Sequence, residues 1–206
     1  LNLFYDYEGQ RQDLIRYMRE TENQLQILLC ELAAYLHNKD MEINVWDRII
    51  AFEGRMHEFI KAAYDYQDNT FHSHPGYYID YFEMRLAQLQ VLHNLHYEIK
   101  KIRKMPKQAL VIADYIMYMA DYVVEMNIPD QQIEKLEEIS EQMKQEELPK
   151  TREEFEGRAL LYHILMDLEE FLVYKKRFVN GLDEKKLRIY WKQEMEQKDS
   201  ANELQK

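Results

Sequence analysis

The chain has 206 residues, which is enough for one domain with a sizeable hydrophobic core and no need of a metal or disulfide for stability. Its 5 glycines and 4 prolines are few for this length, so turn-rich β-sandwiches and Gly-rich phosphate loops are disfavoured and helices are favoured. The formal net charge of −11 repels polyanions at long range, so we expect no nucleic-acid partner.

The sequence also indicates a cellular compartment. A single cysteine, Cys30, excludes an internal disulfide and fits a reducing environment. The most apolar segment, residues 109–128, contains three acidic residues and is not expected to span a bilayer. The chain shows no secretory signal, so we expect it to lie in the cytosol. It begins at Leu1 without an initiating Met, and we therefore expect it to be a piece of a longer polypeptide.

Two antiparallel helices are predicted at the start of the chain. Apolar residues at spacings of three, four and seven predict a long helix from Asp13 to His37, interrupted only by Thr21. After the polar turn at 38–40, we expect Asn44 to cap a second helix. The predicted inward face of this second helix consists of Trp46, Ile49, Met56, Ile60 and Ala63.

A polar loop at residues 67–76 separates this pair from the next two predicted helices. The third helix runs from about Tyr78 to Arg103, and cations in its last turn complement the negative end of the helix. The fourth helix, from Lys107 to about Glu125, is apolar around more of its circumference than the others. We therefore expect the fourth helix to be central in the bundle.

The fifth predicted helix, from Pro129 to Glu146, is strongly acidic and is expected at the surface. The sixth helix starts at a capping box in which Thr151 and Glu154 satisfy each other's backbone N–H groups, and it ends near residue 180. Residues 1–181 are therefore predicted to form one all-α antiparallel bundle of about six helices, with long first and third helices. Residues 182–206 are predicted to be a polar tail with a short docked helix, disordered from about Asp199.

Metal-dependent and nucleophilic chemistry have little support in the sequence. Helical di-metal sites use Glu-x-x-His pairs, and none of the 7 histidines follows a glutamate at that spacing. His72 and His74 form the best remaining metal candidate, but two ligands do not make a site, so an exposed polar loop is the preferred interpretation. Cys30 lies on an apolar helix face, where a thiol is inert. We therefore expect no cofactor and no enzymatic activity.

The unusual feature of the composition is its 16 tyrosines. Phenol rings can stack on an aromatic ligand, and an arginine can hold a carboxylate in a bidentate pair. The candidate site for a small aromatic acid consists of Tyr81, Arg85, Tyr115, Tyr118, Tyr122 and Arg158. The preferred alternative is that the tyrosines form core or contacts between subunits and that Arg158 pairs with Glu154 in its own helix.

The segment around the capping box carries a family resemblance. It reads L-P-K-T-R-E-E-F-E-G-R-A, and its motif residues are Leu148, Pro149, Thr151, Arg152, Glu153, Glu154, Phe155, Glu156 and Arg158. This segment resembles the end of the C-terminal cytoplasmic domain of the putative aromatic acid exporter family found in Firmicutes. Further similarity covers most of residues 1–180. The family usually has alanine where Gly157 stands in this chain.

The resemblance implies a membrane protein of the fusaric acid resistance-like superfamily, whose transmembrane helices are absent from this sequence. It implies that this domain lies at the cytoplasmic face of the plasma membrane, with its own transmembrane domain as a partner. We expect a non-catalytic assembly or regulatory domain that forms a homo-oligomer through exposed Tyr and Met faces. The alternatives are a sensor of aromatic carboxylates and, less favoured, a metal-binding helical protein.

Overall fold

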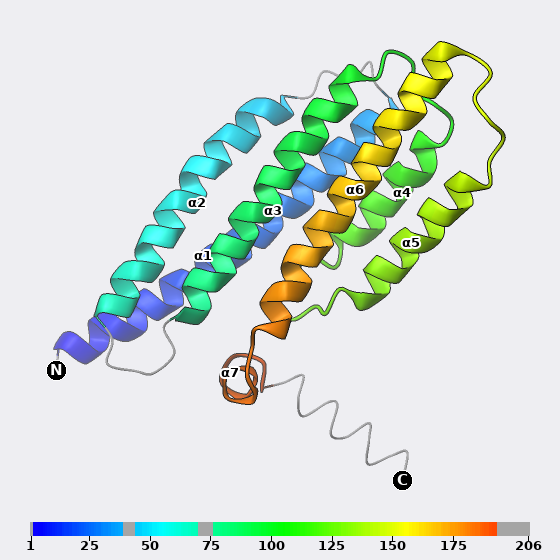
Figure 1. Cartoon of the computed structure of the whole chain (residues 1–206). Coiled ribbons are helices and arrows are strands. Elements are labelled where there is room, and N and C mark those ends of the chain that lie inside the picture. The colour runs from blue at the N-terminus through cyan, green and yellow to red at the C-terminus, as the bar shows by residue number, and fades with distance from the viewer. Residues whose placement is uncertain (1, 39–43, 70–75, 193–206) are drawn as a thin grey trace, which may run out of the picture.

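The computed structural model describes residues 2–38, 44–69 and 76–192, with side chains from residue 7 onward. Within these ranges the chain forms α-helices and no β-strand, which confirms the all-α prediction (Figure 1). The helices are α1 (Asn2–His37), α2 (Val45–Asp68), α3 (Gly76–Lys101), α4 (Ala109–Ala120), α5 (Asp130–Lys144), α6 (Arg152–Asn180) and α7 (Glu184–Tyr190). The candidate metal loop with His72 and His74, and the segment predicted to be disordered from Asp199, lie outside the described residues.

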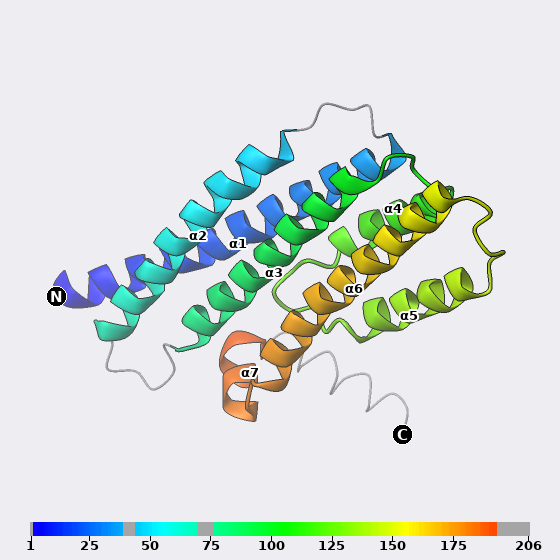
Figure 2. The same ribbon diagram turned by 45° about the horizontal axis from the view of Figure 1, so that its top comes forward.

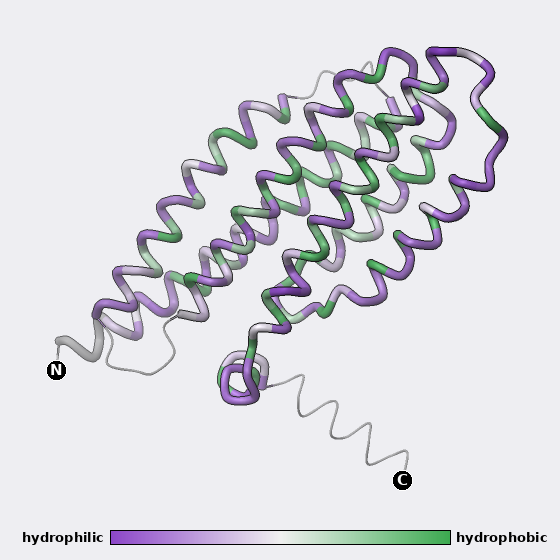
Figure 3. The backbone as a smooth tube through the Cα atoms, in the orientation of Figure 1, coloured by the Kyte–Doolittle hydropathy of each residue, from purple (hydrophilic) through white to green (hydrophobic). Residues whose placement is uncertain are grey.

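The helices pack side by side into one elongated bundle (Figures 1 and 2). Helix α3 packs against α1, α2 and α6, while α1 also contacts α2 and α4. Helix α5 lies against α6 and α4 on the outside, and it is mostly hydrophilic, as its acidic sequence predicted (Figure 3). The boundary between a domain and a tail near residue 181 stays a prediction.

Helix α1 begins at Asn2, well before the predicted start at Asp13. The additional turns pack on the end of α2, where Tyr7 stacks on Tyr66 at 5.0 Å between ring centroids and accepts a 2.7 Å hydrogen bond from the Tyr66 hydroxyl. Thr21, the polar residue within the apolar face, is fully buried and donates its hydroxyl proton to the Tyr17 carbonyl at 2.8 Å. The helix therefore tolerates Thr21 because the hydroxyl has a local acceptor.

The predicted inward face of α2 is partly wrong. Ile49, Met56 and Ala63 are buried as expected, but Trp46 is 42% exposed and Ile60 is only partly buried. Phe52 and Phe59 are buried in their place, because the buried positions of α2 alternate between spacings of three and four from Val45 to Tyr66. The side chain of Asn44 also does not cap α2; it donates to the Asp47 carboxylate at 2.7 Å.

The predicted central position of the fourth helix is wrong as well. Helix α4 contacts α1 and α5, and its outward side leaves Leu110, Val111 and Met117 between 45% and 47% exposed. The helix that is surrounded by neighbours is α3, in which even Arg85 and Gln88 are buried. The many apolar residues of α4 therefore reflect an apolar face that is exposed, and not a central position in the bundle.

The start of α6 agrees in part with the predicted capping box: Thr151 caps the helix as expected, but the Glu154 carboxylate bonds to the residue before the cap. The backbone N–H of Glu154 donates to the Thr151 hydroxyl oxygen at 3.1 Å, and the Glu154 carboxylate accepts from the backbone N–H of Lys150 at 2.7 Å. One turn later, Gly157 passes the loop between α3 and α4 so closely that a Cβ atom would lie 3.0 Å from the Pro106 ring. Glycine at this position therefore permits the close approach of the loop to α6.

Candidate functional site

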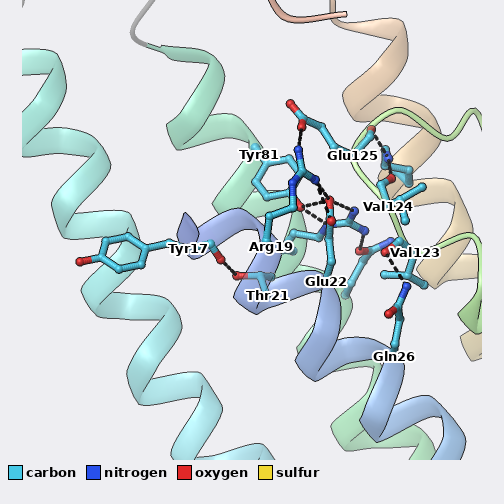
Figure 4. Close-up of polar contacts among 12 residues, drawn as sticks. Tyr17, Arg19, Thr21, Glu22, Gln26, Tyr81, Val123, Val124 and Glu125 are labelled. Carbon is cyan, nitrogen blue, oxygen red and sulfur yellow. Dashed lines mark hydrogen bonds and ion pairs between the residues drawn. The ribbon is translucent and has the colours of Figure 1, made fainter. Parts of the chain in front are cut away.

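Charged and polar side chains meet inside the bundle where α1, α3, α6 and the connection between α4 and α5 converge (Figure 4). We call this set the polar network. Its members are Arg19, Glu22, Tyr77, Tyr81, Arg85, Gln88, Glu125, Lys175 and Trp191. All of them except Arg19 are buried.

The first half of the polar network is centred on Glu22 of α1. Arg19 donates to both carboxylate oxygens of Glu22 at 2.9 and 2.8 Å, and the Tyr81 hydroxyl donates to Oε1 at 3.1 Å. Arg85 donates through Nε to the Tyr81 hydroxyl oxygen at 3.1 Å, and its Nη2 lies 3.8 Å from Glu22 Oε1. Among the described residues, Nη2 of Arg85 is a buried donor with no hydrogen-bond partner.

The second half is centred on Glu125, which follows α4. Arg19 Nη2 donates to one carboxylate oxygen at 2.5 Å, and the Tyr77 hydroxyl donates to the other at 2.7 Å. Arg19 therefore joins both carboxylates and ties α1 to the chain between α4 and α5 (Figure 4). Hydrogen bonds of this charge-assisted kind are stronger than neutral ones.

Helix α6 joins the network through backbone carbonyls. Lys175 Nζ donates to the carbonyls of Val124 and Glu125 at 2.7 and 2.6 Å. Gln88 Nε2 donates to the carbonyl of Phe171 at 2.8 Å, while its Oε1 accepts from Arg85 Nη1 at 2.9 Å. The non-helical residues between α4 and α5 therefore have their buried carbonyls satisfied by a lysine of α6.

Burial and charge act together on the protonation of these groups. Burial lowers the pKa of the Arg19 guanidinium, but the hydrogen bonds and charges of Glu22 and Glu125 outweigh it and raise that pKa above its usual value. Burial raises the pKa of Tyr77, and the neighbouring Glu125 carboxylate raises it further. Burial likewise raises the pKa of Tyr81. Both phenols therefore stay neutral donors, and the network ties helices together through fixed hydrogen bonds.

The structure places the six predicted ligand-site residues in three regions of the fold. Tyr81 and Arg85 lie in the polar network. Tyr115 is buried and donates to the Gln132 carbonyl at 2.6 Å, while Tyr118 packs between Tyr115 and Tyr122 with ring centroids 5.9 and 5.1 Å away.

Arg158 lies elsewhere, near the start of α6. It donates to the carbonyl of Glu147, and it lines a surface pocket together with Lys104 and Gln108. The predicted ion pair between Arg158 and Glu154 is not formed in the described part of the chain, where Arg158 bonds to the Glu147 carbonyl instead. The backbone hydrogen bond of Lys150 is the main cause of the lowered pKa of Glu154, and the Arg158 charge lowers it further. The binding of an aromatic acid to these residues stays a prediction.

Sequence reasoning missed Arg19, Glu22, Glu125, Lys175 and Trp191 as members of one network. Two of them carried a signal, because Glu22 follows Met18 by four positions on the inward face of α1, and Lys175 precedes Phe178 by three on that of α6. A charged residue on an inward helix face needs a buried partner. The signal indicates buried ion pairs but does not say which residues pair.

Two further properties of the described residues concern metals and membranes. These residues contain no group of three or more His, Cys, Asp or Glu side chains that could hold a metal ion. His96 is buried, its Nδ1 has no hydrogen-bond partner among the described residues, and burial lowers its pKa. None of the helices in the described ranges combines the length and apolar character that crossing a bilayer requires.

Comparison with known proteins confirms the resemblance seen around residues 148–159. The chain is 26% identical over 167 residues to the "Uncharacterized protein YqjA" of Bacillus subtilis (strain 168), and the match covers 80% of this chain and 51% of YqjA. The chain therefore spans about half the length of that relative.

A solved structure shares the fold. The crystal structure of a "putative membrane protein from Clostridium difficile 630" matches with a TM-score of 0.71 at 24% identity, covering 80% of this chain and 98% of that one. The family described as "Putative aromatic acid exporter C-terminal domain" matches residues 11–176. With four fifths of its length matched, the chain belongs to the family of C-terminal domains of putative aromatic acid exporters.

Proposed function

We propose that this chain is a non-catalytic cytoplasmic assembly domain of an exporter-like membrane protein. Its family is defined as a C-terminal domain of exporters, and the relative YqjA is about twice as long as the part that matches, which leaves length for a membrane portion. The two polar-network carboxylates each accept hydrogen bonds from at least two side chains, which supports a structural rather than a catalytic use.

The observation that carries this proposal is the way α1 is built into the bundle. It has 36 residues and is therefore about 54 Å long. It contacts α2, α3 and α4, and Arg19 and Glu22 tie it to α3 and to the residues after α4. A rotation or displacement applied at the start of α1 would move the bundle as a unit, which suits a helix that transmits a change from an adjacent membrane portion.

Assembly requires a contact surface, and the outward face of α4 is suited to it. Leu110, Val111 and Met117 are nearly half exposed on this face, and Tyr122 just after the helix is 39% exposed. A group of exposed apolar side chains on one element is typical of interaction sites. We propose that copies of the chain associate through this α4 face.

Sedimentation equilibrium tests the assembly role. We expect the chain to self-associate at micromolar to millimolar concentrations, and we expect Met117→Glu to weaken association at least about tenfold, because it places a charge in the contact. Met166→Glu is the matched control, since Met166 of α6 is 63% exposed and lies outside this face. A wild-type chain that stays monomeric throughout that range would contradict the proposal.

A ligand-sensing role is the second candidate, and Arg85 is the observation that favours it. Its Nη2 is a buried donor without a hydrogen-bond partner among the described residues, and its guanidinium carbon lies 5.0 Å from the Tyr81 ring centroid. A small aromatic carboxylate reaching this point would gain a charge-assisted hydrogen bond. Benzoate at millimolar concentration would then raise the melting temperature, and Arg85→Lys would reduce that shift; no shift in the wild-type chain would exclude this role.

A further inference from the structure

Helix α7 packs on the bundle with side chains that are at most partly buried, among them Leu187 and Tyr190. It has seven residues, none of them buried, and it lies beyond the family match, which ends at residue 176. Trp191, directly after the helix, is in contrast only 1% exposed and is among the largest fully buried side chains of the described residues. The most deeply buried side chain of this C-terminal segment is therefore at its end. Figures 1 and 2 show α7 next to the C-terminal end of α6.

The position of Trp191 is a formed aromatic slot. The indole Nε1 donates to the Tyr77 hydroxyl oxygen at 2.9 Å, and Lys175 Nζ lies 5.8 Å from the centroid of the indole ring. Tyr190 stacks on Tyr77 at 3.9 Å with an interplanar angle of 5°, and Phe178 lies on Tyr77 at 5.6 Å. Because Tyr190 belongs to α7 itself, the slot without this segment offers the rings of Tyr77 and Phe178, one cation and one hydrogen-bond acceptor to a planar aromatic group.

The slot is connected to α1 by hydrogen bonds. The Tyr77 hydroxyl, which accepts from Trp191, donates its own proton to Glu125, and the same carboxylate accepts from Arg19. Filling or emptying the slot therefore changes the hydrogen bonding of Tyr77, which is itself a member of the polar network.

The balance of forces indicates that this segment can leave the bundle without unfolding it. A helix of seven residues has little stability of its own in water. The segment 182–191 is held by the buried indole of Trp191, the rings of Tyr190 against Tyr77 and Tyr78, and the partly buried Leu182 and Leu187. These contacts are opposed by the conformational entropy that the ten residues lose when they are ordered. The long helices α1, α3 and α6, by contrast, each place a row of fully buried side chains in the core.

We propose that residues 182–191 are a displaceable latch: Trp191 plugs the aromatic slot on Tyr77, and its withdrawal opens that slot to a planar aromatic hydrogen-bond donor such as indole. The latch does not depend on the proposed assembly role, because it rests on contacts within one chain. Chemically, the opened slot favours a neutral N–H donor, since the carboxylate of Glu125 lies on the other side of the Tyr77 hydroxyl.

Amide hydrogen exchange of the full chain tests the opening. The amide of Leu187 donates at 3.0 Å to the carbonyl of Asp183, the N-cap of α7, so its exchange reports on the latch, whereas the Leu92 amide lies within α3. We expect Leu187 to exchange at least about 100-fold faster than Leu92 in the wild-type chain. Equal exchange of the two amides would overturn the proposal, and this comparison needs no substitution.

The substitution Trp191→Ala tests the role of the plug. It is expected to raise the exchange rate of Leu187 at least about tenfold while Leu92 is unchanged, because it removes the main attachment of the latch. Ile189→Ala is the matched control, since Ile189 is in α7 but 49% exposed, and it should leave both amides nearly unchanged. An equal acceleration of Leu187 and Leu92 by Trp191→Ala would contradict a separate latch.

Free indole tests the slot. In Trp191→Ala, millimolar indole should shift the resonances of Tyr77 and raise the melting temperature, because it refills the vacated space. The Ile189→Ala chain, in which Trp191 still fills the slot, should show neither effect. Indole without effect on Trp191→Ala, or with the same effect on both variants, would refute the slot.

Discussion

Replacing Glu125 by glutamine should destabilise the bundle far more than an ordinary surface substitution of the same kind. Glu125 is 7% exposed and accepts hydrogen bonds from Arg19 of α1 and Tyr77 of α3. Glutamine keeps the shape and one acceptor oxygen, but its NH₂ group must face one of two donors. One donor therefore loses its partner, and the negative charge opposite Arg19 disappears.

The magnitude follows from the burial of the two donors. An unsatisfied buried donor costs about 1–3 kcal/mol, and a hydrogen bond to a charged group contributes about 1.5–3 kcal/mol. The Arg19 side chain is 51% exposed and can turn toward water, which reduces its share. We therefore expect Glu125→Gln to lower the free energy of unfolding by about 2 kcal/mol, and the melting temperature by about 6 °C for a chain of this size.

Urea unfolding followed by circular dichroism measures this difference. The matched control is Glu141→Gln, because Glu141 pairs with Lys144 at 3.2 Å but is 60% exposed, and its loss should cost less than about 0.5 kcal/mol. A double-mutant cycle of Glu125→Gln with Tyr77→Phe should give a coupling energy of about 1 kcal/mol. If Glu125→Gln costs no more than Glu141→Gln, the polar network does not hold the helices together and our reasoning is wrong.

Three further predictions concern single positions. Gly54→Ala should stabilise α2 by about 0.5–1 kcal/mol, since nothing lies within 4 Å of its added Cβ. Gly157→Ala should stabilise the fold less, or destabilise it, because its added Cβ would contact Pro106. The urea midpoints of the two variants measure this difference. Burial, with like charges nearby, raises the pKa of Asp167 to about 6. Between about pH 4 and 6 the folded chain therefore holds a proton that the unfolded chain has lost, and the free energy of unfolding falls as pH rises. Asp167→Asn should be more stable than the wild-type chain by about 1 kcal/mol at pH 7.5, after allowance for solvent screening, and should lose this advantage at pH 4. Thr151→Ala should cost about 1 kcal/mol in thermal unfolding by removing the hydroxyl that caps α6, and an unchanged melting temperature would contradict that role.

The sequence predicted those parts of the fold that depend on neighbours along the chain. The bond from the Glu154 N–H to the Thr151 hydroxyl joins residues three positions apart and was predicted correctly, whereas the bond from the Lys150 N–H to the Glu154 carboxylate was not predicted. The apolar period of α1 was visible from Leu14 onward because it repeats locally. The added turns at the start of α1 were missed because they depend on the contact between Tyr7 and Tyr66, which are 59 positions apart.

The polar network could not be assembled from the sequence, because its contacts join distant segments. Arg19 and Glu125 are 106 positions apart, and Tyr77 and Trp191 are 114 apart. Composition also misplaced α4, since it does not reveal how many sides of a helix are covered by neighbours. Of the predicted site residues, only Tyr81 and Arg85 lie in the network.

The most direct test of the proposed function uses the complete product of the gene in membrane vesicles. We predict that the product is membrane-bound and that added protease digests this domain in inverted vesicles, whose cytoplasmic face is outward, but leaves it intact in sealed right-side-out vesicles. Digestion in right-side-out vesicles, or recovery of the complete product without membrane association, would contradict the assignment of this bundle as the cytoplasmic domain of an exporter-like protein.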